Sequence, residues 1–164
     1  MLNLRKYDWL FVLIAGILSM VITFVPMSVL SMGGGDSFSV WIFGFELEFN
    51  NFRPDGIGFL PAPFCIMGAI FALTLLILGI LLLVSAVQNK NGKDSKLQQK
   101  QLLGIGFFYL FLPIIFRTLM LISCSIIGEA DLTVYLGLGF YSIELFMPIS
   151  AFFLLLSGAL KQSR

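Results

Sequence analysis

Arg117 and Glu144 are the only charged residues inside the four long apolar stretches of this sequence, so they are the first candidates for chemistry. If these stretches lie in a membrane, a charge within them is costly and usually serves a purpose. The pair could be an ion pair that locks two helices together. It could instead form a polar site for a proton, an ion or a small solute, with Glu144 as the titrating group. A third role is a docking site that a helix of another subunit completes.

The positions of Arg117 and Glu144 predict that they lie at the same depth. Arg117 precedes the end of its stretch at Ile127 by ten residues, and Glu144 follows the start of the next stretch at Val134 by ten. At about 1.5 Å per residue, each lies about 15 Å from the boundary. The connection of residues 128–133 is short enough to force an antiparallel hairpin, which sets Arg117 opposite Glu144.

Small and polar residues recur every three or four positions along both stretches, which predicts a polar seam between the two helices. Each helix also contains a proline, which frees a backbone carbonyl four residues earlier, and the five N–H donors of Arg117 could satisfy such acceptors. The predicted seam consists of Arg117, Glu144, Tyr109, Tyr141, Pro113 and Pro148.

The composition predicts that these residues belong to an all-α transmembrane protein. The chain has 164 residues, of which 59% are hydrophobic and 12% charged, whereas soluble domains average about 25% charged residues. The stretches at 9–31, 64–87, 103–127 and 134–160 each approach or exceed the roughly 20 residues needed to cross a bilayer. We therefore expect one integral membrane domain over residues 1–164, folded as a four-helix membrane bundle.

The distribution of basic residues predicts the orientation. Lys and Arg precede the first stretch, fill the loop at 88–102 and close the chain, whereas the loop at 32–63 carries Arg53 as its single base. The positive-inside rule then places both termini and the loop at 88–102 in the cytoplasm, and the loop at 32–63 outside a plasma or cell membrane. The first stretch is too long for the apolar core of a signal peptide, so we expect it to be retained as a span.

The outer loop at 32–63 is expected to form a small β-hairpin cap. Residues 37–49 alternate as in a strand, and a turn is expected at 53–56, where the sequence reads Arg-Pro-Asp-Gly. This pattern could anchor the loop at the membrane interface, offer a recognition surface to a partner, or form a folded cap. The alternation predicts one face that carries Trp41, Phe43, Phe45, Leu47 and Phe49.

The residues needed for common catalytic and cofactor sites are missing from the sequence. There is no histidine, no phosphate-binding loop, no cluster of metal ligands and no nucleophile with a partner base, so we expect a noncatalytic protein without a cofactor. The basic residues follow the topology rather than a patch, which argues against nucleic-acid binding. Cys65 and Cys124 could form an outer disulfide or remain free as small buried hydrophobes.

In its layout the chain resembles the claudin-like four-span membrane proteins, with four spans, both ends inside and a strand-bearing first outer loop. Trp41-Ile-Phe-Gly44-Phe supplies a Trp and a Gly of that family's first-loop signature, and the loop lacks the family's two cysteines. We expect a noncatalytic structural or interaction component of the membrane, either self-associating or an accessory subunit of a larger complex. Its expected partners are the lipid bilayer and either copies of itself or other membrane subunits. The alternative is a small oligomeric transporter or channel that uses Arg117 and Glu144.

Overall fold

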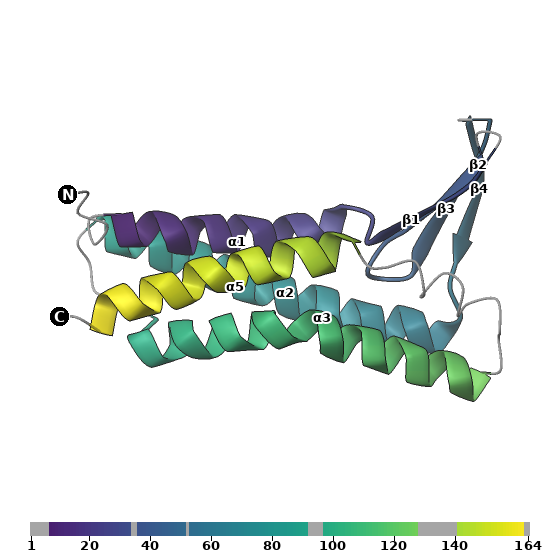
Figure 1. Ribbon diagram of the computed structural model, residues 1–164. Helices are drawn as coiled ribbons and strands as arrows, with labels where there is room; N and C mark the ends of the chain where they lie inside the picture. Colours follow the sequence, from purple (N-terminus) through teal and green to yellow (C-terminus); the bar gives the residue numbers. More distant parts are fainter. Residues whose placement is uncertain (1–6, 34–35, 52, 92–96, 128–140, 163–164) are drawn as a thin grey trace. The chain divides into compact units, whose positions relative to one another are not determined.

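The computed structural model describes residues 7–33, 36–51, 53–91, 97–127 and 141–162, which form four α-helices and one β-sheet (Figure 1). The helices are α1 (Asp8–Phe24), α2 (Ala62–Lys90), α3 (Gln99–Ile127) and α5 (Tyr141–Gln162). Three of them, α2, α3 and α5, are long and apolar enough to cross a membrane, and α1 is apolar but has only 17 residues. The chain is therefore mostly helical, as its composition predicts.

The prediction of one span over residues 9–31 is wrong for its last seven residues. Helix α1 ends at Phe24, and Ser28–Gly33 forms strand β1. The cause is Pro26, because proline cannot donate the next helical hydrogen bond and its ring disfavours helical geometry at the preceding residue. The other predicted stretches lie within or overlap the helices found, with α2 and α3 each starting earlier than predicted. Residues 128–140, which include the predicted connection at 128–133, lie outside the described residues.

Four strands, rather than the predicted hairpin, lie between α1 and α2. Strands β1 (Ser28–Gly33), β2 (Asp36–Val40), β3 (Phe45–Asn50) and β4 (Arg53–Phe59) pair in chain order, each antiparallel to the next. The predicted single strand at 37–49 is interrupted between Val40 and Phe45, where the amide of Gly44 donates to the carbonyl of Trp41 and Gly44 has φ 81°. Glycine reaches this conformation without steric cost.

Two further predictions for the outer loop need correction. Trp41 and Phe43 lie in the turn between β2 and β3, so they do not share a strand face with Phe45. The turn expected at 53–56 is instead part of β4, and the chain reverses between Asn50 and Arg53. Asn51 has φ 48° at this reversal, a left-handed conformation that asparagine tolerates better than most residues. The Asn50-Asn51 dipeptide therefore predicts the turn better than the Arg-Pro-Asp-Gly sequence at 53–56 does.

The chain divides into two compact units. The first unit comprises residues 1–21, 75–112 and 145–164, and the second comprises 22–74 and 113–144. In the first unit the helices approach one another closely at glycines. Gly16 of α1 lies against the backbone of Gly79 in α2, while Gly106 of α3 and Gly158 of α5 lie against leucines of each other's helix. The described core of this unit includes Val12, Ala15, Leu75, Leu82, Ala86, Leu102, Tyr109, Leu112, Met147, Ala151 and Leu154.

In the second unit the turn between β2 and β3 is seated on the first turns of α2. Gly68 faces the carbonyl of Ile42 so closely that a Cβ at position 68 would overlap the carbonyl oxygen. Ile42 is 1% exposed, and the indole N–H of Trp41 donates to the carbonyl of Phe24 at the end of α1 (3.0 Å). The described core of this unit includes Ile22, Met27, Val40, Ile42, Phe64, Ala72, Phe116, Met120 and Ile143.

Replacing Gly68 with alanine should disrupt the seating of the sheet on α2. The added methyl group would collide with backbone rather than with a flexible side chain, so we expect Gly68→Ala to destabilise the protein by about 3 kcal/mol or more. Gly104→Ala is the matched control, because Gly104 is also helical and no atom of the described residues lies within 4 Å of the place that its added methyl group would take. The control should be neutral or stabilising by up to about 1 kcal/mol. Thermal unfolding in detergent micelles measures both, and equal melting temperatures would contradict the seating.

Candidate functional site

Arg117 and Glu144 contact each other in the second unit. Nη1 of Arg117 lies 3.2 Å from Oε1 of Glu144 and donates a hydrogen bond to it. Arg117 lies in the C-terminal half of α3, and Glu144 lies in the first turn of α5, where the free backbone N–H groups of the helix favour a negative charge. The contact therefore combines an ion pair with a favourable position for the carboxylate.

Helices α3 and α5 pack against each other within each unit. In the first unit Gly106 lies against Leu155 and Leu103 lies against Gly158, and in the second unit Arg117 lies against Glu144. The glycines of the first unit allow the close approach of the backbones.

The Arg117–Glu144 pair is not enclosed by the described part of the chain. The Arg117 side chain is 44% exposed and that of Glu144 is 36% exposed. Large apolar side chains around it are exposed as well, among them Ile114 and Leu145. The pair is thus a charged spot on an otherwise apolar helix surface.

Of the remaining residues of the predicted seam, Tyr109 has a hydrogen-bond partner on α1. Tyr109 is fully buried, and its hydroxyl lies 2.7 Å from that of Ser19 on α1, which itself donates to the carbonyl of Leu75 (2.8 Å). Since a serine hydroxyl carries one proton, Tyr109 is the donor in the Tyr109–Ser19 bond. Pro113 and Pro148 are half-buried inside their helices, and the side chain of Tyr141 lies outside the described part of the structure.

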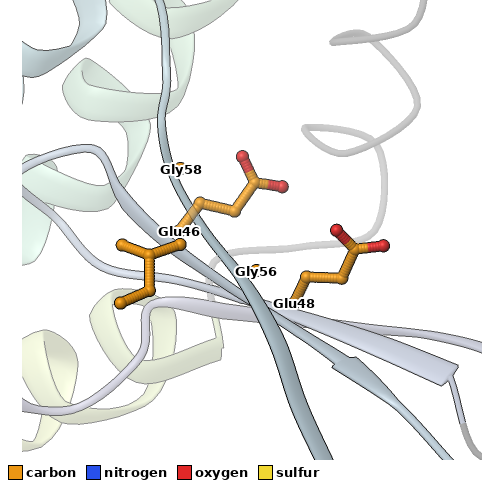
Figure 2. A pocket seen from close by; sticks show the side chains of 5 residues that line it. Glu46, Glu48, Gly56 and Gly58 are labelled. Atoms are coloured by element: carbon orange, nitrogen blue, oxygen red, sulfur yellow. The ribbon is translucent and has the colours of Figure 1, made fainter.

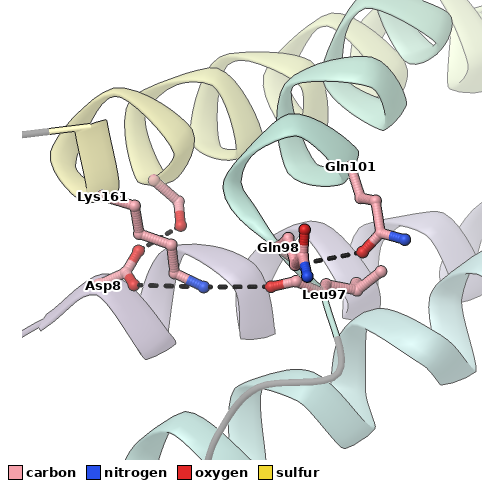
Figure 3. A network of polar contacts seen from close by, with 6 residues as sticks. Asp8, Leu97, Gln98, Gln101 and Lys161 are labelled. Atoms are coloured by element: carbon pink, nitrogen blue, oxygen red, sulfur yellow. Dashed lines mark hydrogen bonds and ion pairs between the residues drawn. The ribbon is translucent and has the colours of Figure 1, made fainter.

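A second polar cluster, in the first unit, was not found from the sequence. Asp8, in the first turn of α1, is 8% exposed and accepts a hydrogen bond from the hydroxyl of Ser157 on α5. Figure 3 shows Lys161 between Asp8 and the backbone of Leu97. The Nζ atom of Lys161 lies 4.0 Å from a carboxylate oxygen of Asp8 and 3.4 Å from the carbonyl oxygen of Leu97. The sequence pattern marks Lys161 only as an indicator of orientation, and no local spacing links residues that lie 149 positions apart.

The half of the sheet formed by β3 and β4 presents two different faces. Direct cross-strand pairs place Phe45 opposite Phe59 and Leu47 opposite Ile57, so these four apolar side chains share one face. The other face carries Glu46 and Glu48, which lie over the glycines of β4 and border an open hollow of about 170 Å³ (Figure 2). Gly56 and Gly58 leave the space that the two carboxylates occupy. Burial, and in second place the charge of Glu48, raises the pKa of the Glu46 carboxyl above its ordinary value.

The described residues offer no metal centre, because no group of three His, Cys, Asp or Glu side chains among them could hold an ion. Cys65 is a free thiol that donates to the carbonyl of Leu60 at 3.0 Å, and the side chain of Cys124 lies outside the described part of the structure.

No protein-family model, curated protein or solved structure matches this chain.

Mutations of the Ser19–Tyr109 contact should have unequal effects. Ser19→Ala leaves the buried Tyr109 hydroxyl without its acceptor, so we expect a loss of about 1–3 kcal/mol in the free energy of unfolding. Tyr109→Phe removes the donor while Ser19 keeps its bond to Leu75, so it should cost about 1 kcal/mol. Thermal or denaturant unfolding of both variants tests this order, and a larger loss for Tyr109→Phe would contradict it. Thr118→Val is a control, because that exposed hydroxyl bonds only within α3.

The raised pKa of Glu46 should make the sheet less stable as the pH rises. Between the ordinary and the raised pKa, the folded sheet keeps the Glu46 proton that the unfolded chain has lost. The stability that this proton contributes is therefore fully present below the ordinary pKa and is lost as the pH rises through the raised pKa. Glu46→Gln should therefore stabilise the sheet at pH 7 by a few tenths of a kcal/mol, roughly, and reduce the pH dependence. Thermal melting followed by Trp41 fluorescence in a Trp9→Phe background measures this between about pH 4 and pH 7. Glu48→Gln should keep a weaker pH dependence, and an unchanged profile in Glu46→Gln would contradict the assignment.

Proposed function

We propose that this chain is a noncatalytic integral membrane protein with four spans, α1, α2, α3 and α5, that acts as a structural or accessory subunit by docking a second transmembrane chain. The observation that carries the proposal is the half-exposed Arg117–Glu144 pair on the surface formed by α3 and α5. Both termini then lie in the cytoplasm of a cell with this protein in its plasma membrane, as the basic residues of the sequence favour.

The lengths of the helices are compatible with four spans. Helices α2, α3 and α5 have 29, 29 and 22 residues, and α1 has 17, which is at the short end of the range that crosses a bilayer. Most of the exposed side chains along α2 are large and apolar, including Ile70, Ile77 and Ile80. A lipid environment would cover these side chains, and in water they would form an apolar surface far larger than a soluble monomer exposes.

The Arg117–Glu144 pair would be poorly placed if lipid alone covered it. An arginine near the centre of a membrane helix costs about 2.5–3.5 kcal/mol on insertion scales. Its contact with Glu144 offsets part of this cost, but the remaining N–H groups and the second carboxylate oxygen need polar partners or water. A helix from a second chain with a polar group at this level would supply them and would bury the pair.

The hydrogen-bonded polar groups of the first unit favour an interaction role over a transport path. Ser19 bonds both Tyr109 and the Leu75 carbonyl, and Asp8 bonds Ser157, so these groups serve the packing of the helices. The rival function is a small oligomeric transporter or channel built around Arg117 and Glu144. Buried polar atoms without a hydrogen-bond partner among the described residues favour it, because they could contact water. They are the hydroxyl of Ser142, two residues before Glu144, the hydroxyl of Ser85 and the side-chain nitrogen of Asn89.

Neutralising the pair should weaken assembly more than folding. We expect Arg117→Leu and Glu144→Gln each to retain a folded chain, because both side chains are exposed, but to lose the docked chain. Native mass measurement of the protein extracted in mild detergent reports the assembly, and circular dichroism reports the fold. Thr118→Val is the matched control, because it changes the neighbouring exposed position of α3 and leaves the charged pair intact.

The charge exchange Arg117→Glu with Glu144→Arg separates the remaining roles. A purely structural lock predicts that the double exchange restores whatever each single change removes, whereas a docking site predicts restored folding without restored assembly. A monomer in both wild type and variants would contradict docking. A homo-oligomer with pH-dependent ion flux in liposomes, lost in Glu144→Gln, would contradict the accessory role and favour the transporter.

A further inference from the structure

The half of the sheet formed by β3 and β4 is amphipathic, and its two faces are defined by the strand register. On β2 the pattern is reversed, because Val40 pairs with Glu46 and Ser39 pairs with Leu47. Phe45 and Leu47 on β3 pair directly with Phe59 and Ile57 on β4, and directly opposed residues of an antiparallel pair lie on the same face. Ile57 and Phe59 are 72% and 70% exposed, which is unusual for side chains of this size. The described part of the chain does not cover this end of the sheet.

The opposite face has the reverse character. Glu46 pairs with Gly58 and Glu48 pairs with Gly56, and both carboxylates extend over the glycines on the same side of the sheet (Figure 2). One face of β3 and β4 therefore carries aromatic and aliphatic side chains in these pairs, and the other carries two acids. This half of the sheet needs an apolar environment on one side and water on the other.

The apolar face lies close to α2 along the chain, so the nearest apolar environment is the membrane that α2 is proposed to cross. The exposed pair Ile57 and Phe59 lies at the end of β4, and only Leu60 and Pro61 separate β4 from the start of α2. The other end of β3 and β4 carries polar residues, with Asn50, Asn51 and Arg53 at the chain reversal. The exposed apolar pair thus lies at the end of β4 next to α2, where a membrane crossed by α2 would be nearest.

The free edge of the sheet limits how deep this face can lie. Strand β4 is an edge strand that pairs only with β3 in the described sheet, so its outward backbone groups need water or another donor and acceptor. Hydrocarbon offers neither, which excludes an open edge from the bilayer core. The headgroup layer offers both water and a contact for aromatic rings.

We infer that the apolar face of the sheet, formed by Phe45, Leu47, Ile57 and Phe59, rests on the headgroup layer of the outer leaflet beside α2, with Glu46 and Glu48 directed to water. This inference rests on the proposed crossing of the membrane by α2. The lipid surface thereby holds the sheet at the level of the outer helix ends, in addition to the contact of Ile42 with Gly68.

Site-directed spin labelling in phosphatidylcholine nanodiscs tests this arrangement. Single cysteines at Ile57, Phe59 and Glu48 are introduced into a background in which Cys65→Ser supplies a hydroxyl donor in place of the thiol and Cys124→Ala removes the second thiol. The exposure of all three labelled positions makes these changes mild. Collision rates with molecular oxygen, which enriches in lipid, and with a water-soluble nickel chelate report the surroundings of each label. We expect an oxygen-to-nickel ratio several-fold higher at 57 and 59 than at 48.

A fourth label at Ile77, an exposed residue in the middle of α2, separates failure of this inference from failure of the membrane placement. A lipid-like ratio at 77 with water-like ratios at 57 and 59 would overturn the inference and leave the spans intact. A water-like ratio at 77 would overturn both. Protection of 57 and 59 from both reagents would show that another protein, and not lipid, covers this face, which also overturns the inference.

Discussion

The contact between the carbonyl of Ile42 and the backbone of Gly68 is the constraint on which the outer part of this protein depends. Because a side chain at position 68 would overlap the carbonyl, the turn between β2 and β3 can approach α2 this closely only over a glycine. The same turn brings Gly44 against Cys65 and directs the indole of Trp41 to the last carbonyl groups of α1. The turn between β2 and β3 therefore contacts α2 through Ile42 and α1 through Trp41.

The two ion pairs of the described structure differ in a way that separates their roles. Asp8 and Lys161 are largely buried, and each has a further hydrogen-bonding partner within the chain, as a pair that holds helices together requires. Arg117 and Glu144 bond to each other but are left partly exposed on an apolar surface. A structural lock needs a buried pair with further partners within the chain, as Asp8 and Lys161 have. A site that another molecule completes needs a partly exposed pair, as Arg117 and Glu144 are. This contrast is the physical basis of the proposed docking role.

The two proposed contacts use different parts of the second unit and need not compete. A second transmembrane chain would approach the surface of α3 and α5 at Arg117 and Glu144, and the headgroup layer would cover Phe45, Leu47, Ile57 and Phe59 on the sheet. Both follow from the same rule, that a surface in a membrane must match the polarity of what surrounds it. A charged pair in an apolar surface needs a polar partner, and an apolar sheet face beside a span needs lipid.

The sequence by itself determined the features that depend on local pattern. The long apolar stretches predicted the helices, and the constant spacing along two antiparallel helices placed Arg117 level with Glu144. The end of α1 at Phe24 could also have been predicted from Pro26, and the reversal near Asn51 from its asparagines.

The tertiary structure alone decided which residues far apart in the chain contact each other. Tyr109 bonds Ser19 across 90 residues, Asp8 meets Ser157 across 149, and the exposure of the Arg117–Glu144 pair depends on what neighbouring elements leave uncovered. Local spacing carries no information about such contacts, because they arise only when helices far apart in the chain pack side by side.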